Sequence, residues 1–305
     1  MAVKNKHWLL GFSIVFLLVL GIGFFEPSGV LRGYLKGEKT FRNRPTTYWR
    51  RGLIDSDPAV QSRTLQTLEQ GGPEAVPVLV ELLQTEDKDD WEAGEVRRTA
   101  GEILGRFGPE ARTAIPALVA TLNDPDPHLR SVSALALGQI GAQTPEVCPA
   151  LIGLLKTESR LSAVRALNRF GFEARAAVPS LIELLQDPEP EVRWNAAQAL
   201  GAIGPEARAA VSALIERLKD PDADVREHSA ESLGLIGRDA EPAVPALIDA
   251  LQDKNARVRR DAARSLGQLG SAARPAIPAL TQLKRDESDR VREAAIKSLH
   301  QIGNP

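Results

Sequence analysis

The chain has 305 residues, of which 43% are hydrophobic and 26% are charged, and its length allows either two globular domains or one extended architecture. Its 38 Lys and Arg against 40 Asp and Glu leave a formal net charge of −2, which lacks the basic excess typical of nucleic-acid-binding proteins. The single cysteine, Cys148, excludes an intramolecular disulfide, a CxxC redox pair and a cysteine-rich zinc site, and the four scattered histidines predict no metal centre.

An uncharged apolar run, residues 8–25, follows a short N-terminal tail of residues 1–7. As a helix this run would be about 27 Å long at ~1.5 Å per residue, close to the thickness of a bilayer's hydrocarbon core. Two lysines precede the run and a Glu-Pro pair follows it, so charge and a helix breaker mark its ends. We expect a retained single-pass transmembrane signal anchor, followed by a juxtamembrane linker of residues 26–44. A cleaved signal peptide and a buried soluble helix are the alternatives, but the run is long for a signal peptide and ends in two phenylalanines.

The charges around the apolar run give two opposite indications of topology. Lys4 and Lys6 precede it, whereas more basic residues follow between Arg32 and Arg44, and a strict count places the following domain in the cytoplasm. The two lysines directly before the run, however, resemble the charged region of a secretory signal, after which a long domain is translocated largely regardless of its charge. We expect the membrane-anchored domain to be extracytoplasmic.

A sequence repeat fills the rest of the chain, from residue 45 to residue 303. In one unit, apolar residues at helical spacing lead to Asp220-Pro221-Asp222, which ends a first helix. A second apolar face then runs to Gly237, which we expect to supply a left-handed turn. The closing glycines of the units are Gly72, Gly108, Gly141, Gly171, Gly204, Gly237, Gly270 and Gly303, with 33 residues between each of the last five. Each unit is therefore predicted to be two antiparallel helices.

These units resemble the HEAT-repeat family, in particular the HEAT-like repeats also found in bilin lyases. Residues 177–187, AVPSLIELLQD, match a first helix with its internal proline, and residues 192–204, VRWNAAQALGAIG, match a second helix. The resemblance covers roughly residues 45–303. It implies an all-α fold, an α-solenoid or superhelix of about eight helical hairpins, here with one N-terminal transmembrane helix, and it says little about activity.

The resemblance also implies a structural role for an acid–base pair that recurs in the repeats. The pairs are Asp124/Arg130, Asp187/Arg193, Asp220/Arg226, Asp253/Arg259 and Asp286/Arg292. They match the ladder that joins successive HEAT repeats, and recurrence in each repeat argues against catalysis, because a catalytic site is needed once. Gln61, Thr85 and Thr157 interrupt the pattern, so the ladder should weaken toward the N-terminal half.

In this family the second helices line the concave face, and the residues three and six positions beyond the repeat's valine are implied to point into it. In repeats five to seven, these positions and the neighbouring tryptophan give a mixed polar strip suited to protein or peptide recognition: Trp194, Asn195, His228, Asp261 and Arg264. An ordinary solvated surface is the alternative interpretation.

Repeat two carries extra acidic residues around Trp91, in residues 86–95. This segment could be a second partner contact or a solvated loop. A calcium site is the weakest interpretation, because the glycine turn and the distant glutamate of a calcium loop are missing.

Together these features predict a non-enzymatic, membrane-anchored HEAT-repeat scaffold that binds a protein or peptide partner through its concave helical surface, without a metal or cofactor. A bilin lyase-like chromophore-handling enzyme is the alternative that the resemblance implies, although a membrane anchor fits it poorly. The iron site of deoxyhypusine hydroxylase, another HEAT-repeat enzyme, requires His-Glu pairs, and no histidine here is directly followed by a glutamate. Nucleic-acid binding is not expected, because the arginines near Arg257 are offset by aspartates and aromatic residues are few.

Overall fold

The structure is a computed structural model that describes residues 30–85, 91–141 and 145–303. The chain divides into two compact units, Met1–Leu118 and Val119–Pro305. The predicted tail and anchor, residues 1–7 and 8–25, lie outside the described residues. In the part of the chain that the structure describes, no helix combines the length and the apolar character that a membrane crossing requires.

The described part of the first unit starts with a helix and a short hairpin and continues with helical pairs. Its elements are α2 (Val30–Lys36), β1 (Thr40–Phe41), β2 (Arg44–Pro45), α3 (Thr46–Leu53), α4 (Pro58–Glu69), the 3₁₀ helix η1 (Gly72–Ala75), α5 (Val76–Leu83), α6 (Trp91–Phe107) and η2 (Gly108–Ala114). Helix α3 packs on α4, and α5 packs on α6.

The described part of the predicted juxtamembrane linker, residues 26–44, is folded against α3 and α5. Strands β1 and β2 pair antiparallel, and Phe41 of β1 is buried with its ring centroid 5.3 Å from that of Trp49. The backbone amide of Lys39 donates a 2.8 Å hydrogen bond to the Glu81 carboxylate on α5. An aromatic pair and a side-chain acceptor therefore hold this segment in place.

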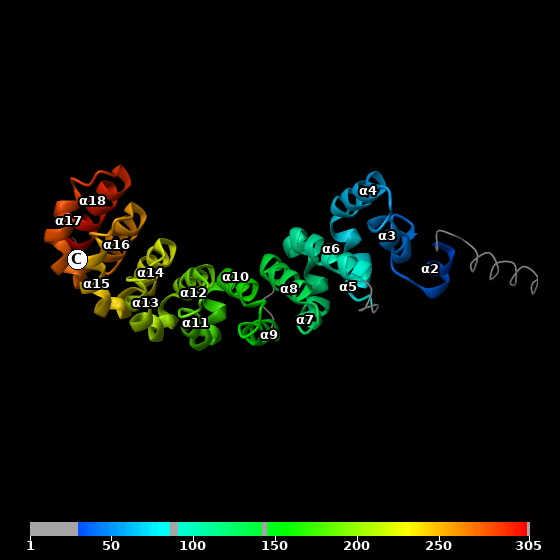
Figure 1. Cartoon of the computed structure of the whole chain (residues 1–305), viewed down its shortest axis with the longest axis horizontal. Helices are drawn as coiled ribbons and strands as arrows, with labels where there is room; N and C mark the ends of the chain where they lie inside the picture. The colour runs from blue at the N-terminus through cyan, green and yellow to red at the C-terminus, as the bar shows by residue number, and fades with distance from the viewer. Residues whose placement is uncertain (1–29, 86–90, 142–144, 304–305) are drawn as a thin grey trace, which may run out of the picture. The chain divides into compact units, whose positions relative to one another are not determined.

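The second unit is a regular succession of helical hairpins. Its elements are α7 (Ile115–Thr121), which begins before the unit boundary, α8 (Pro127–Ile140), α9 (Val147–Leu154), α10 (Arg160–Phe170), η3 (Gly171–Ala177), α11 (Val178–Leu184), α12 (Pro190–Ile203), η4 (Gly204–Ala210), α13 (Val211–Arg217), α14 (Ala223–Ile236), η5 (Gly237–Ala243), α15 (Val244–Ala250), α16 (Ala256–Gln268), η6 (Gly270–Ala276), α17 (Ile277–Leu283) and α18 (Asp289–Gly303). The second helices of the hairpins, α8 to α18 by even number, pack side by side in chain order, and α11, α13, α15 and α17 form the other layer (Figure 1).

Helix α14 starts and ends where the sequence predicts. Asp222 caps α14 by accepting hydrogen bonds from the backbone amides of Asp224 and Val225. Gly237 ends the same helix at φ 78° and ψ −141°. The helix ends at the predicted glycine, but the predicted left-handed turn is not formed there, because this ψ lies outside the left-handed helical region and in backbone space that is essentially restricted to glycine.

The first helix of a repeat differs from the single helix that the sequence predicts. A 3₁₀ segment precedes a short α-helix, as η3 precedes α11. Pro179 lies in the first turn of α11, where a backbone N–H has no partner within the helix. The internal proline of the repeat therefore marks the junction between the 3₁₀ segment and the α-helix.

Small residues bring the second helices into close contact. The hydroxyl of Ser232 on α14 donates a 2.7 Å hydrogen bond to the carbonyl of Ala197 on α12, and Ser265 on α16 repeats this contact with Ala230 on α14. A Cβ atom added at Gly201 would lie only 3.0 Å from the Cα atom of Ser232. The layer of second helices is thus closely packed, with its apolar residues filling the core and a row of polar side chains on its outer side.

Candidate partner-binding surface

A ladder of arginine–aspartate pairs joins successive repeats of the second unit. The Nε and Nη2 atoms of Arg193 donate to the two carboxylate oxygens of Asp220 at 2.9 and 2.8 Å, and Nη1 donates to the carbonyl of Asp187 at 2.9 Å. The same side-chain pairing occurs between Arg160 and Asp187, between Arg226 and Asp253, and between Arg259 and Asp286. The predicted structural ladder is confirmed.

The partners within the ladder differ from those that the sequence pattern suggests. Arg193, Arg226 and Arg259 contact the aspartate of their own repeat only through its backbone carbonyl, and their carboxylate partners come from the following repeat. The carboxylate of Asp220 also accepts a 3.0 Å hydrogen bond from the amide of Asp222, which fixes its orientation. Where Thr157 replaces an aspartate, Arg130 instead pairs with the exposed carboxylate of Glu158 at 2.7 Å. The ladder is therefore weaker at this step.

The electrostatics of the ladder favour charged aspartates. Burial by itself raises the pKa of Asp220, but hydrogen bonds from Arg193 and from the Asp222 amide, together with the charge of Arg193, outweigh it and hold the pKa below its usual value. A carboxylate whose pKa is lower in the folded state stabilises the fold above its unfolded pKa. This contribution is lost as the pH falls through the folded pKa.

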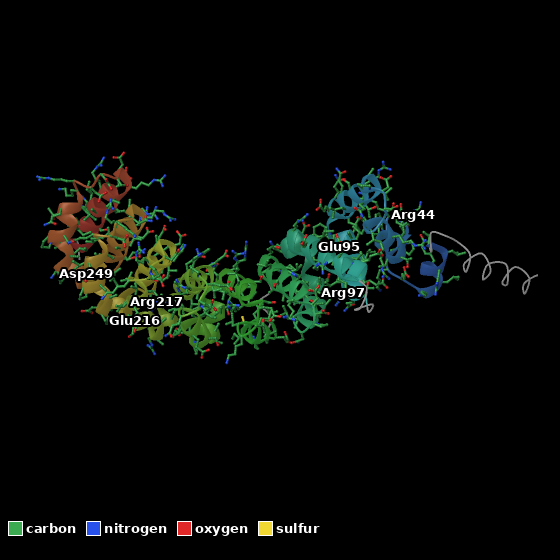
Figure 2. All side chains as sticks on the ribbon, in the orientation of Figure 1. Arg44, Glu95, Arg97, Glu216, Arg217 and Asp249 are labelled. Carbon is green, nitrogen blue, oxygen red and sulfur yellow. The ribbon has the colours of Figure 1, made fainter. Side chains whose placement is uncertain are left out.

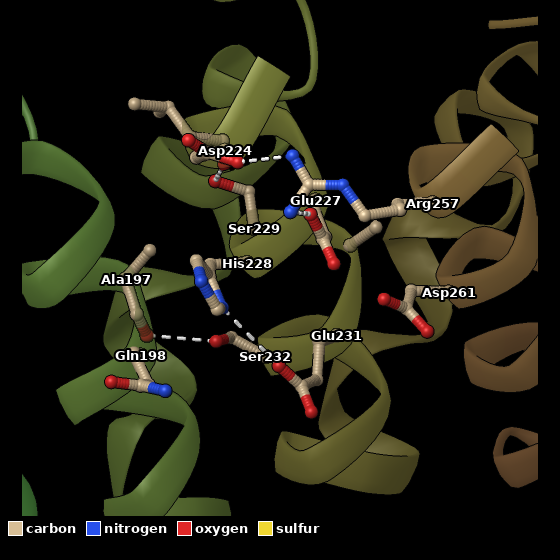
Figure 3. Close-up of polar contacts among 12 residues, drawn as sticks. Ala197, Gln198, Asp224, Glu227, His228, Ser229, Glu231, Ser232, Arg257 and Asp261 are labelled. Carbon is tan, nitrogen blue, oxygen red and sulfur yellow. Dashed lines mark hydrogen bonds and ion pairs between the residues drawn. The ribbon is translucent and has the colours of Figure 1, made fainter. Parts of the chain in front are cut away.

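The candidate binding surface is the side of the second helices α8 to α18 that faces away from the layer of first helices. We call it the second-helix face. Near its centre the rings of Trp194 on α12 and His228 on α14 stack, with centroids 5.1 Å apart and planes 26° apart. The Nδ1 atom of His228 lies 3.3 Å from the carboxylate of Glu231 (Figure 3). The hydrogen bond from His228 lowers the pKa of Glu231. The predicted neighbours in repeats five and six are thus brought together as a half-buried aromatic pair beside a carboxylate.

The structure places the other predicted residues of this strip differently. Asn195 is 2% exposed and donates a 2.7 Å hydrogen bond to the carbonyl of Glu191. Asp261 is 4% exposed, and its carboxylate pairs with Arg260 at 2.6 Å and with Arg264 at 3.3 Å. Both side chains are therefore engaged within the fold, whereas the Arg264 side chain is 59% exposed and available to a partner.

A second group of polar residues on this face was not predicted. Arg257 on α16 reaches across to Asp224 and Glu227 on α14 at 2.5 and 2.9 Å (Figure 3). Arg260 pairs with Glu227 at 3.1 Å. Burial raises the pKa of Glu227, more strongly than the charge of Arg257 lowers it. These residues occupy the positions one before and two beyond the repeat's valine. Helical periodicity also places these two positions on the side of the helix that carries the predicted strip.

Two pockets open on the second-helix face. One, of about 410 Å³, lies among α8, α10 and α12 and is lined by Arg165, Asn168, Arg169, Asn195 and Gln198 among others. The other, of about 480 Å³, lies between α16 and α18 and includes Arg264 in its lining.

Trp91 is the first residue of α6, and its side chain and residues 86–90 lie outside what the structure describes. The predicted contact at this acidic segment therefore stays a prediction. Within the described ranges, no three or more His, Cys, Asp or Glu side chains are grouped so that they could hold a metal ion.

Helical hairpins stacked in two layers define an all-α solenoid. The family model described as HEAT repeats matches residues 89–160, 157–234 and 211–300. These matches cover more than half of the chain, which therefore belongs to the HEAT-repeat family. No protein of curated function matches its sequence.

Solved structures show the same fold. An engineered protein is 25% identical with a TM-score of 0.59, over 84% of this chain and 78% of its own. The YibA protein of Escherichia coli is 20% identical with a TM-score of 0.60, over 89% of this chain and 96% of its own. Kap121p, solved bound to Pho4p, is 14% identical with a TM-score of 0.61, over 84% of this chain and 33% of its own. This chain thus spans about a third of Kap121p, and these two likenesses below 25% identity concern the fold alone.

Proposed function

We propose that this HEAT-repeat protein is a non-enzymatic scaffold that binds a protein partner through the second-helix face and is tethered to the membrane by residues 8–25. The observation that carries the proposal is the combination, on one exposed layer of helices, of the stacked Trp194 and His228 with exposed arginines and two open pockets. Aromatic and arginine side chains are the ones that anchor protein interfaces. The structure of Kap121p with Pho4p is an example of this fold in complex with a protein.

The local hydrogen bonding around His228 favours binding over catalysis. The hydroxyl of Ser229 donates to the carbonyl of Val225, and that of Ser232 donates to the carbonyl of Ala197, both at 2.7 Å (Figure 3). These hydroxyls serve helix packing, and a nucleophile would need a base as its partner instead. The carboxylate of Asp261 is held by arginines. The bilin lyase-like alternative rests on the resemblance alone.

Site-specific crosslinking in the native cell tests which layer of helices meets the partner. A photo-crosslinking residue at Gln198 or Glu231, on the second-helix face, is expected to form a protein adduct. The matched positions Glu216 on α13 and Asp249 on α15 are exposed on the other layer and are expected to form none (Figure 2). Adducts of equal yield from both layers, or from Glu216 and Asp249 only, would contradict the proposal.

The membrane part of the proposal has its own test. Alkaline phosphatase, which is active only outside the cytoplasm, is fused after Pro305. An active fusion that stays with the membrane fraction is expected, because the proposed anchor exports the domain that follows it. An inactive fusion would place the repeats in the cytoplasm, and an active fusion released from the membrane would indicate a cleaved signal.

A further inference from the structure

The pocket between α16 and α18 has an unusual arrangement of charge. Three cationic side chains line it, Arg264 from α16 and Arg290 and Lys297 from α18, together with a single carboxylate, that of Glu293. Arg290 and Lys297 are exposed, and the described residues place no ion pair on either of them. The pocket therefore carries an excess of positive charge.

This excess follows from the order of residues along the second helices. On α14 and α16 the position before the repeat's valine holds Asp224 and then Arg257, which pair across the two helices at 2.5 Å. On α18 the same position holds Arg290, so a cation follows a cation. Six residues beyond the valine, Lys297 likewise follows Arg264. Between α14 and α16 an acid therefore meets a base, whereas between α16 and α18 bases occupy both sides of the pocket.

The cations of α16 are not equally available. Arg257 and Arg260 are directed toward α14, where Glu227 and Asp224 hold them. Arg264 contacts Asp261 through one nitrogen at 3.3 Å, and its side chain is 59% exposed. Since a guanidinium has five N–H donors, most of those on Arg264 remain open to a ligand.

We propose that this pocket binds the carboxylates of an acidic, extended segment of the protein partner. The inference rests on the proposed function and adds the chemistry of the partner. Arginine pairs with carboxylates in a bidentate geometry, and a lysine adds a point charge beside it. Gln268 and Gln301 also line the pocket, and their amide groups can both donate to and accept from a peptide backbone. A volume of about 480 Å³ accommodates a few side chains of such a segment.

Fluorescence anisotropy with a labelled hexaglutamate peptide tests the proposal on the full chain in a mild non-ionic detergent at low salt. The wild-type chain is expected to bind, and the double variant R290E/K297E is expected to bind at least about tenfold more weakly, because it reverses the two unpaired charges. The matched control R208E/R238E changes the net charge equally at exposed positions in η4 and η5, away from the pocket, and is expected to stay within about twofold of wild type. The exchange R290K/K297R should retain binding.

Four results would overturn the proposal: no binding of hexaglutamate by the wild-type chain, equal binding of hexaglutamine, equal losses in both charge-reversal variants, or displacement of the peptide by stoichiometric inorganic phosphate. Circular dichroism on each variant checks that its helical content is unchanged. Failure here leaves the photo-crosslinks at Gln198 and Glu231 in place. Failure of the proposed function removes those crosslinks whatever hexaglutamate does, so the two outcomes are distinguishable.

Discussion

Replacing Arg193 with alanine is expected to lower the free energy of unfolding by about 3–5 kcal/mol, the usual cost of leaving one partner of a buried ion pair uncompensated. The Arg193 and Asp220 side chains are only 10% and 2% exposed, and the arginine also holds the carbonyl of Asp187. One substitution thus removes two hydrogen bonds to the following repeat, together with those to the carbonyls of Asp187 and Pro188 in the same repeat. The measurement is chemical denaturation of the full chain followed by circular dichroism.

The pH dependence of the same variant separates an ionic role from simple loss of packing. In the wild type, Asp220 has a lowered pKa, so the unfolded chain binds more protons and stability falls as the pH falls through the acidic range. Without Arg193 this loss should be smaller. Arg208→Ala, an exposed position in η4, is the control and is expected to change stability by less than about 0.5 kcal/mol. If Arg193→Ala and Arg208→Ala unfold at a similar denaturant concentration, the structural role of the ladder is refuted.

The second large effect is expected at Leu200, a fully buried residue of α12. Leu200→Ala removes apolar contacts between neighbouring hairpins and leaves a cavity, which costs about 2–5 kcal/mol. Leu235→Ala is the matched control, because it makes the same chemical change on α14 at a side chain that is 46% exposed. Thermal unfolding of both variants compares them directly. Equal shifts of the midpoint would show that the repeat register assigned to these helices is incorrect.

Much of the repeat architecture could be predicted because it depends on local signals. Closing glycines such as Gly237 need a positive φ, and the buried Leu and Val positions follow helical spacing. The 3₁₀ segments were missed because each is too short for the spacing of its apolar residues to distinguish a 3₁₀ helix from an α-helix. The hairpin formed by β1 and β2 was missed because its stability comes from tertiary contacts of Phe41 and Glu81.

The candidate surface was harder to predict for a similar reason. Helical position alone placed Asn195 and Asp261 on the exposed layer, but close contact between the second helices buries both side chains. The partner of each ladder arginine also depends on how successive repeats stack, which no spacing within one repeat reveals. In contrast, the stacking of Trp194 on His228 agrees with their adjacent positions in consecutive repeats.

Oxidative footprinting of the chain alone and of its crosslinked partner complex, each followed by mass spectrometry, tests most directly whether the second helices form the binding surface. Oxidation of Trp194, His228 and Leu235 reports on the second-helix face. Oxidation of the exposed Phe172, in η3, and Ile277, in α17, reports on the layer of first helices and the 3₁₀ segments that lead into it. The account predicts that the partner reduces oxidation of the first group and leaves the second group unchanged. Protection of Phe172 and Ile277, with Trp194, His228 and Leu235 still oxidised at the rate of the free chain, would contradict it.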